Sequence, residues 1–241
     1  MLSSPTMAEE SSHAAADRAK FDAYAADYEA VHRQNIAASG EDPDYFATYK
    51  LRCLERLVGD GWDQPVLDYG CGVGMVTQKL CERFSEVAGF DPSDESIDVA
   101  RGRVPAARFH ADMSGVPDGH YGLVIMSGVL HHVAPAERAD VVARAIRKLR
   151  PGTGRLVVFE HNPLNPLTRR AVAMCPFDDD ATLLWPWEAR GLLSRAGLRD
   201  VTRKFIVFLP RALAALRWIE PHLGPLPIGA QMMLVGTRGP A

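Results

Sequence analysis

Short apolar runs alternate with stretches of helical periodicity through the first two thirds of the chain. Each run is short enough for a buried strand, and each intervening stretch places its apolar residues on one face of a helix. Such alternation is typical of βαβ units and predicts a mainly parallel, doubly wound sheet. The predicted strands are 66–69, 87–90, 108–110, 121–127 and 155–160, and the predicted helices between them are 75–83, 94–101 and 136–149.

The two ends of the chain depart from this alternation. Residues 1–16 are rich in Ser, Ala and Glu and are expected to be disordered, which leaves 17–241 as a single domain. Helices at 15–37 and 45–58 precede the first strand, so 17–60 is expected to form a set of N-terminal cap helices. The last third is predicted to contain helices 185–196 and 211–220 and strands 201–208 and 231–236, with the last strand antiparallel.

The composition is that of one ordinary globular domain. The 241 residues are 47% apolar and 24% charged, so the core needs no disulfide or metal to stabilise it. The net charge of −3, without a long basic tract, argues against a nucleic-acid partner. We also expect no metal site and no disulfide framework, because the cysteines at 53, 71, 81 and 175 lack zinc-like spacing.

The chain shows no targeting or membrane-spanning signal. Its N-terminus lacks a basic segment followed by an apolar one, and no run of about 18 apolar residues occurs. We therefore expect a cytoplasmic protein that does not bind membranes and that is a monomer or a homodimer.

A glycine loop follows the first predicted strand, in the sequence Asp68-Tyr69-Gly70-Cys71-Gly72-Val73-Gly74. Glycines at alternate positions permit positive φ angles and leave the backbone open to a close neighbour. A dinucleotide fingerprint requires a third glycine that this loop lacks, since Met75 and Thr77 occupy the two positions where it would fall. A simple strand-to-helix turn is the alternative explanation.

With Asp68 placed where a carboxylate faces a cation at the end of the strand, the loop resembles motif I of the class I S-adenosylmethionine-dependent methyltransferases. The resemblance implies a Rossmann-like, seven-stranded sheet with an antiparallel last strand, and S-adenosylmethionine as the cofactor. It also implies a cofactor-binding role for the loop, whose members are Gly70, Cys71, Gly72 and Gly74.

The same resemblance implies further cofactor contacts at the ends of later strands. Asp91, followed by Pro92, would bind the ribose hydroxyls, although a helix N-cap is the alternative. Asp112 would meet the adenine amino group and Met113 would pack on the ring, unless Asp112 is an exposed loop residue. Backbone carbonyls of the segment that begins at Ser127 and Gly128 would help hold the methionine ammonium, and an N-terminal helix with Tyr24 and Tyr28 would close over the cofactor unless those tyrosines pack the core.

Three histidines are candidate general bases. His131 and His132 follow the fourth predicted strand, and His161 follows the fifth. Imidazole has an ordinary pKa near 6.5, so it can accept a proton at cytoplasmic pH. A base is needed only if the nucleophile arrives protonated, and a structural hydrogen-bonding role is the alternative for each histidine.

The leading hypothesis is methyl transfer to an oxygen, nitrogen or carbon nucleophile of a small-molecule metabolite, such as a natural product or a sugar. The insertions in 163–230 would build the acceptor pocket. The aromatic residues there could line an apolar pocket, but we expect core packing for most of them; they are Trp185, Trp187, Phe205, Phe208 and Trp218.

Other functions remain open at this level. A lipid or quinone-like head group is the main alternative acceptor, because 205–234 is apolar and helix 211–220 could meet a membrane surface. A second alternative is a non-catalytic binding module. Methylation of nucleic-acid amino groups is disfavoured, because Ser127-Gly128-Val129-Leu130 stands where that class carries Asp/Asn-Pro-Pro-aromatic.

Overall fold

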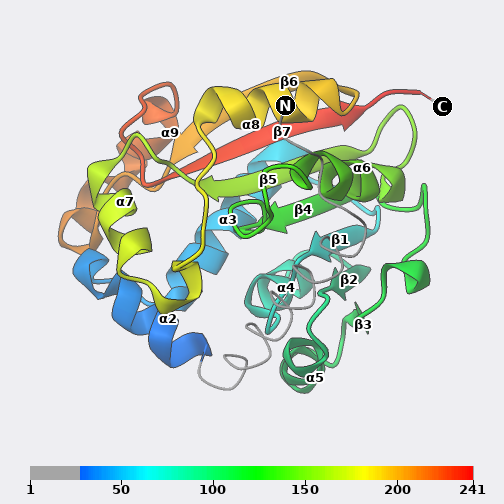
Figure 1. Ribbon diagram of the computed structural model, residues 1–241, viewed down its shortest axis with the longest axis horizontal. Helices are drawn as coiled ribbons and strands as arrows, with labels where there is room; N and C mark the ends of the chain where they lie inside the picture. The colour runs from blue at the N-terminus through cyan, green and yellow to red at the C-terminus, as the bar shows by residue number, and fades with distance from the viewer. Residues whose placement is uncertain (1–27, 241) are drawn as a thin grey trace, which may run out of the picture.

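Seven strands form one sheet in the computed structural model, which describes residues 28–240 (Figure 1). They are β1 (Val66–Tyr69), β2 (Val87–Phe90), β3 (Arg108–His110), β4 (Leu123–Ser127), β5 (Arg155–His161), β6 (Leu198–Ile206) and β7 (Gln231–Arg238). Their order across the sheet is β3-β2-β1-β4-β5-β7-β6. Strands β1 to β5 are parallel, whereas β7 is antiparallel to both neighbours, β5 and β6. The predicted doubly wound sheet with an antiparallel last strand is confirmed.

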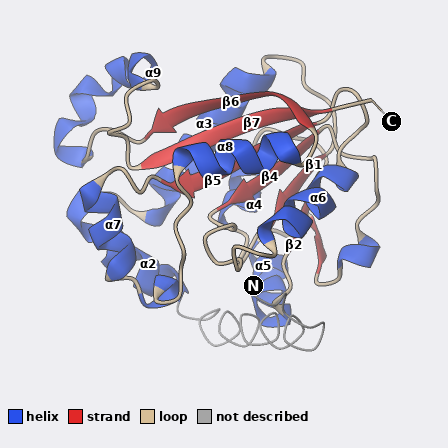
Figure 2. Cartoon of the chain, turned by 45° about the horizontal axis from the view of Figure 1, so that its top comes forward, coloured by secondary structure: helices blue, strands red, loops and turns tan. Residues whose placement is uncertain are grey.

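Helices cover both faces of this sheet (Figure 2). The α-helices are α2 (Tyr28–Ile36), α3 (Pro43–Val58), α4 (Met75–Cys81), α5 (Asp94–Arg103), α6 (Arg138–Lys148), α7 (Pro166–Ala173), α8 (Pro186–Arg195) and α9 (Glu220–Leu223). The 3-10 segments are η1 (Ala37–Ser39), η2 (Met113–Gly115), η3 (Pro176–Asp178) and η4 (Arg211–Ile219). Within residues 28–240, no helix has the length and apolar character needed to cross a bilayer.

Neighbouring residues of the central strands supply two separate apolar layers. Leu67 of β1 packs in the layer beneath α6 and α8, whereas Val66 packs in the layer beneath α3 and α4. Side chains alternate between the faces of a strand, and a parallel sheet covered on both faces is apolar on both. Asp68 interrupts this apolar run at the end of β1 and is itself buried. A buried charge among apolar neighbours is costly unless something pairs with it.

The last third of the chain differs from the sequence prediction in several places. Helix α7 was not predicted, although Asn165 caps its N-terminus by accepting from Leu167 N and Thr168 N and Pro166 occupies its first turn. Strand β6 begins at Leu198 rather than 201, because a bulge at Asp200, with φ of 53°, lets the chain continue across an irregular register. The helix predicted at 211–220 is the 3-10 segment η4, which a non-helical residue interrupts.

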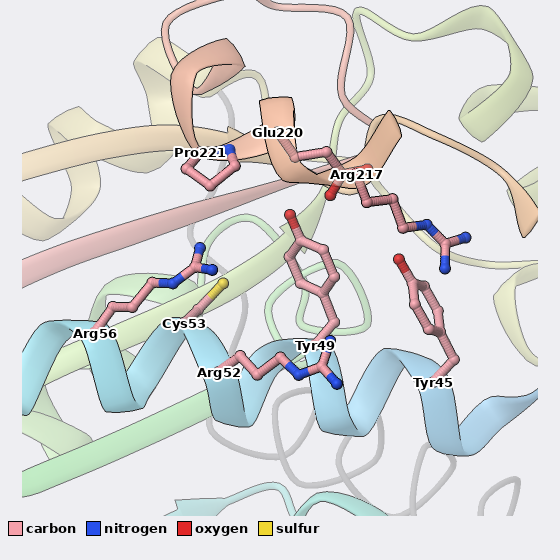
Figure 3. A pocket seen from close by; sticks show the side chains of 8 residues that line it. All are labelled: Tyr45, Tyr49, Arg52, Cys53, Arg56, Arg217, Glu220 and Pro221. Atoms are coloured by element: carbon pink, nitrogen blue, oxygen red, sulfur yellow. The ribbon is translucent and has the colours of Figure 1, made fainter. Parts of the chain in front are cut away.

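The cap helix α3 is joined to the C-terminal segment through a small pocket (Figure 3). Arg217 lies over the ring of Tyr45, 4.3 Å from its centroid, and is paired with Glu41. Glu220 accepts the backbone N–H of Leu209 at 2.9 Å and hydrogen-bonds Tyr49. The pocket holds roughly 70 Å³, well below the roughly 300–1,000 Å³ of typical ligand sites. We interpret it as a structural junction.

Truncating Leu54 on α3 tests how strongly the cap helix is packed on the sheet. Leu54 is fully buried, so Leu54→Ala should lower the free energy of unfolding by about 2–5 kcal/mol. Urea unfolding gives this value, and Leu216→Ala is the control because Leu216 is 46% exposed. A Leu54→Ala change within about 0.5 kcal/mol of wild type would show that α3 contributes little to the core.

Candidate active site

Parallel pairing brings several predicted residues to one edge of the sheet. Asp68 lies in β1, and Asp91 follows the end of the adjacent β2. Ser127 ends β4 and His161 ends the adjacent β5. Parallel strands present their carboxyl ends together, which is where ligands bind in open α/β folds.

Asp68 has one carboxylate oxygen with a partner and one without. Its side chain is buried, and Thr77 Oγ1 donates to Oδ2 at 2.7 Å. Oδ1 has no hydrogen-bond partner among the described residues. Burial raises the pKa of Asp68 to about 6, although the Thr77 hydrogen bond and the charge of Lys50 act in the opposite direction. A buried oxygen left unbonded costs about 1–3 kcal/mol, so this position favours a cationic or donor ligand.

Each glycine of the loop is required for a different structural reason. A Cβ on Gly70 would lie 2.5 Å from Val129 Cγ2, so the loop is pressed against the segment after β4. Gly74 begins α4 with φ of 81°, and a Cβ there would lie 3.1 Å from Ala100 Cβ of α5. Gly72 has φ of 49° and open space where a Cβ would be. Its backbone is therefore open to a close neighbour. Cys71, between Gly70 and Gly72, is buried in the apolar cluster under α5.

Asp91 fixes the loop to the start of α5. Its Oδ2 accepts Gly72 N–H at 2.8 Å, and its Oδ1 accepts Ser93 N–H at 3.0 Å across Pro92. The N-cap of α5 is Ser93, whose hydroxyl accepts from Ser96 N. The alternative reading of Asp91 as the helix cap is therefore wrong.

Asp112 and Met113 lie beyond β3, as predicted, but Asp112 is exposed. Its carboxylate accepts Ser114 N–H at 2.9 Å and the Ser114 hydroxyl at 2.7 Å, and these bonds lower its pKa. Met113 is half-buried against the core. Gly128, with φ of 69°, donates its N–H to Phe159 O at 2.8 Å. Tyr24 and the side chain of Tyr28 lie outside the described residues.

A buried ion pair organises the histidines. His131 Nδ1 lies 2.6 Å from Glu160 Oε2, and both side chains are buried. The other oxygen of Glu160 accepts Leu130 N–H at 2.7 Å. On the opposite side of the ring, His131 Nε2 lies 3.5 Å from Asp178 Oδ1. We refer to His131, His132, Glu160, His161 and Asp178 as the histidine cluster.

The other two histidines surround this pair. His132 Nε2 lies 3.4 Å from the same oxygen of Asp178, and its ring centroid is 4.1 Å from that of His131. The His161 ring meets His131 edge-on, with centroids 5.0 Å apart. The three candidate bases are therefore one contiguous group.

The electrostatics of the cluster separate its histidines. Burial opposes protonation of His131, but the charge of Glu160 and hydrogen bonds to Asp178 and Glu160 outweigh it and raise the His131 pKa to about 9. Burial and the positive charge of His131 lower the pKa of both His132 and His161 to about 4. At neutral pH, one imidazolium thus lies beside two neutral imidazoles.

Arg138, a residue the sequence did not single out, holds the cluster together. It is buried, and its Nε donates to Leu130 O at 2.9 Å and Val133 O at 3.0 Å. Arg138 Nη2 donates to Thr182 O, and Thr182 N–H donates to His131 O at 2.8 Å. The histidine segment is therefore fixed to the segment that follows Asp178.

Other site residues were also missed. Lys50 of α3 is near enough to Asp68 and Glu160 for their charges to raise its pKa, but burial dominates and lowers that pKa to about 8. Two of the missed residues could have been suspected from the sequence. Thr77 is a hydroxyl residue just after the glycine loop, and Glu160 is a charged residue within an apolar strand. Asp178 belongs to an acidic run whose place in the fold the sequence does not reveal.

Asn162, just after β5, has a structural role, and the aromatic residues in 163–230 differ in how deeply they are buried. Asn162 is fully buried, and its Nδ2 donates to Pro227 O and Gly229 O, so it anchors the C-terminal loop. The expectation of core packing holds for Phe205 and the half-buried Phe208. It is wrong for the tryptophans, because Trp185, Trp187 and Trp218 are 37%, 60% and 73% exposed.

Comparison with known proteins identifies the chain. A family model described as a methyltransferase domain matches residues 66–152. An uncharacterised methyltransferase of Synechocystis is 32% identical over 149 residues, which cover 59% of this chain and 70% of that protein. The chain belongs to the class I S-adenosylmethionine-dependent methyltransferases. Its methyl donor is S-adenosylmethionine.

Two further relatives show how far the similarity of this methyltransferase extends. The ubiquinone biosynthesis O-methyltransferase of a Ruegeria species is 27% identical over 172 residues, covering 60% of this chain and 64% of that enzyme. A methyltransferase structure from Archaeoglobus fulgidus superposes with a TM-score of 0.65 at 16% identity, over 82% of this chain and 95% of that one. The family match ends at residue 152, so Glu160, His161 and Asp178 lie beyond it.

Replacing Glu160 tests the electrostatics of the cluster. In wild-type protein dialysed against a chelator, His131 should stay protonated until about pH 9 while His132 and His161 stay neutral above about pH 4. Glu160→Gln removes a stabilising charge and should lower the His131 pKa, as should Asp178→Asn. Long-range ¹H–¹⁵N correlations of the ring nitrogens between pH 4 and 10 measure this directly, with Glu86→Gln as the control. A His131 pKa unchanged in both cluster variants would contradict the assignment.

Proposed function

We propose that this methyltransferase transfers the methyl group of S-adenosylmethionine to a nucleophile of a small-molecule acceptor bound beside the histidine cluster. The observation that carries the donor half of the proposal is the buried Oδ1 of Asp68, which has no hydrogen-bond partner among the described residues. The ammonium of the methionine moiety would satisfy this oxygen. The backbone carbonyls of Ser127 and Gly128 would accept the remaining hydrogen bonds of that ammonium.

The other donor contacts follow from the ends of the strands. Asp91, already fixed by the glycine loop, would receive the ribose hydroxyls. Asp112 and Met113 would meet the adenine, and Tyr24 and Tyr28 would close over the cofactor. Cys71 and Pro92 would contribute through the backbone at their positions. The residues present therefore fit the ammonium, ribose and adenine of this donor.

The acceptor would lie on the side of the histidine cluster, with residues 163–230 building its pocket. The sulfonium already activates the methyl group, so the protein's task is to hold the nucleophile in line with the methyl–sulfur bond. His131 and His132 would position the acceptor, and His161, at the end of β5, would take the proton that a hydroxyl loses. This arrangement supports an oxygen nucleophile first, with nitrogen or carbon as alternatives. The net charge of −3 supports a small molecule over a nucleic acid.

A lipid or quinone-like head group is the second candidate acceptor. Leu164, Leu167, Leu226 and Ile228 are 40%, 76%, 45% and 61% exposed, and we call them the α7 patch. Asn165 Nδ2 donates to Ile228 O at 2.7 Å, which places both halves of the patch together, beyond the end of β5 (Figure 1). A cluster of exposed apolar residues beside a site is typical of a surface that meets a lipid or a partner.

Asp68→Asn tests the donor site. Loss of one partner of a buried charge pair should weaken S-adenosylmethionine binding by about 2–5 kcal/mol in calorimetry. Because burial raises the pKa of Asp68 to about 6, wild-type affinity should fall as the pH drops below 6 and the carboxylate gains a proton. The variant should lose this pH dependence, whereas exposed Asp63→Asn should keep it.

Unaltered affinity in Asp68→Asn would contradict the donor-site proposal. Turnover is tested separately, as formation of S-adenosylhomocysteine with a panel of hydroxylated, amino and carbon acceptors. Tight binding without product across that panel would favour a non-catalytic binding module instead.

Co-sedimentation with anionic liposomes separates the two acceptor classes. A lipid or quinone-like acceptor predicts that the protein pellets with the vesicles, since the exposed Arg169 and Arg170 of α7 would add attraction to the α7 patch. Leu167→Asp should abolish pelleting, while the matched Trp187→Asp on α8 should not. Wild-type protein that stays in the supernatant would leave the small-molecule acceptor as the better explanation.

A further inference from the structure

We infer that His131, His132 and Asp178 form a binding site for one divalent transition-metal ion beside the acceptor position. The existence of the site rests on the geometry of the cluster alone, whereas its role in catalysis rests on the proposed function. One ligand atom from each residue lies within 4.8 Å of the others. This is the one such group of three among the described residues.

The distances are close to those of a tetrahedral site. Two donors that are each about 2.0–2.1 Å from a tetrahedral ion lie about 3.3–3.4 Å apart. Asp178 Oδ1 is 3.5 Å from His131 Nε2 and 3.4 Å from His132 Nε2. Both carboxylate–imidazole distances therefore suit a shared ion, and the ligand atoms of His131 and His132 lie within 4.8 Å of each other.

The second coordination sphere is already in place. Histidine ligands almost always donate their other ring N–H to a carboxylate or carbonyl, which fixes the tautomer. Glu160 does this for His131: its Oε2 lies 2.6 Å from Nδ1, so Nε2 is turned toward Asp178. Glu160 is itself held by Leu130 N–H.

Hydrogen bonds hold together the two segments that carry these ligands. Arg138 and Thr182 tie the segment of His131 and His132 to the segment that follows Asp178. His131 is 3% exposed, whereas His132 and Asp178 are partly exposed. An ion could therefore reach the site from the solvent, and a bound acceptor could reach the ion.

The cluster offers anionic and imidazole donors around one point. Glu160 and Asp178 lie on either side of the His131 ring. Two imidazoles and one carboxylate suit zinc, cobalt, nickel or iron rather than magnesium or calcium.

Three protein donors leave a coordination position open for an acceptor hydroxyl. Coordination would favour loss of the hydroxyl proton to His161 or to water. The resulting oxygen attacks the methyl carbon, so that an oxygen–carbon bond forms and the sulfur–carbon bond breaks. The bonding pair passes to sulfur. The products are the methyl ether, S-adenosylhomocysteine and one proton.

Titration of chelator-stripped protein with Co²⁺ and Zn²⁺ tests the site. We expect one ion per chain by elemental analysis, and visible absorption typical of four-coordinate Co²⁺. His132→Ala and Asp178→Asn should each abolish stoichiometric binding. Glu160→Gln should weaken it by about 10–100-fold. His120→Gln is the control, because His120 is exposed and pairs with Glu86 outside the cluster.

Calorimetry with S-adenosylmethionine on the same samples reports folding and keeps the two proposals distinguishable. No bound ion in wild-type protein that still binds S-adenosylmethionine would overturn the metal site and leave the proposed function intact. Equal metal affinity in wild type, His132→Ala and Asp178→Asn would also overturn it. If His132→Ala fails to bind the donor, His132→Gln replaces it. Stoichiometric metal without any effect on turnover would support the site and overturn its catalytic role.

Discussion

Three consecutive residues in the loop after β4 hold the two halves of the site in a fixed relation. Val129 fills the space beside Gly70, so it sets where the glycine loop can lie. Leu130 donates its N–H to one oxygen of Glu160, and His131 is bound to the other. Closely packed interiors transmit displacements rather than absorb them. The relative position of the glycine loop and of the His131–Glu160 pair is therefore set by one short segment.

The positions of the proposed donor-site residues were predictable because these residues are local to regular βα units. Asp68, the glycine loop and Asp91 each stand at a strand end that the apolar pattern already indicates. The histidine cluster was not, because Glu160 lies 29 positions from His131 and meets it only through the register of β4 and β5. Asp178 contacts His131 and His132 from a distant part of the chain, and the nearby Thr182 is tied to the histidine segment by Arg138, a contact that no sequence pattern predicts. The pattern also failed for the exposed tryptophans, since an apolar residue near a site need not belong to the core.

Buried charges from separate layers converge at the carboxyl edge of the sheet. Asp68 comes from β1, Glu160 from β5 and Lys50 from the cap helix α3. Burial removes water from each of these three groups, and a single buried charge without an opposite charge nearby would destabilise the fold. The cap helices thus do more than cover an apolar face. Helix α3 places Lys50 where the charges of Asp68 and Glu160 act on it, and Tyr45 and Tyr49 of the same helix contact Arg217 and Glu220 of the C-terminal segment (Figure 3).

The position of β7 has a consequence for the order in which the sheet can form. β7 lies between β5 and β6, so β6 has no partner in the sheet until the later strand arrives. During synthesis, β1 to β5 can pair as they emerge, whereas the backbone groups of β6 have no partner strand until β7 has been made. Residues 231–238 complete the sheet by pairing with both β5 and β6. Pairing between residues far apart in the chain carries a loop-closure cost before its contacts are gained, so we expect this part of the sheet to form later than its local helices.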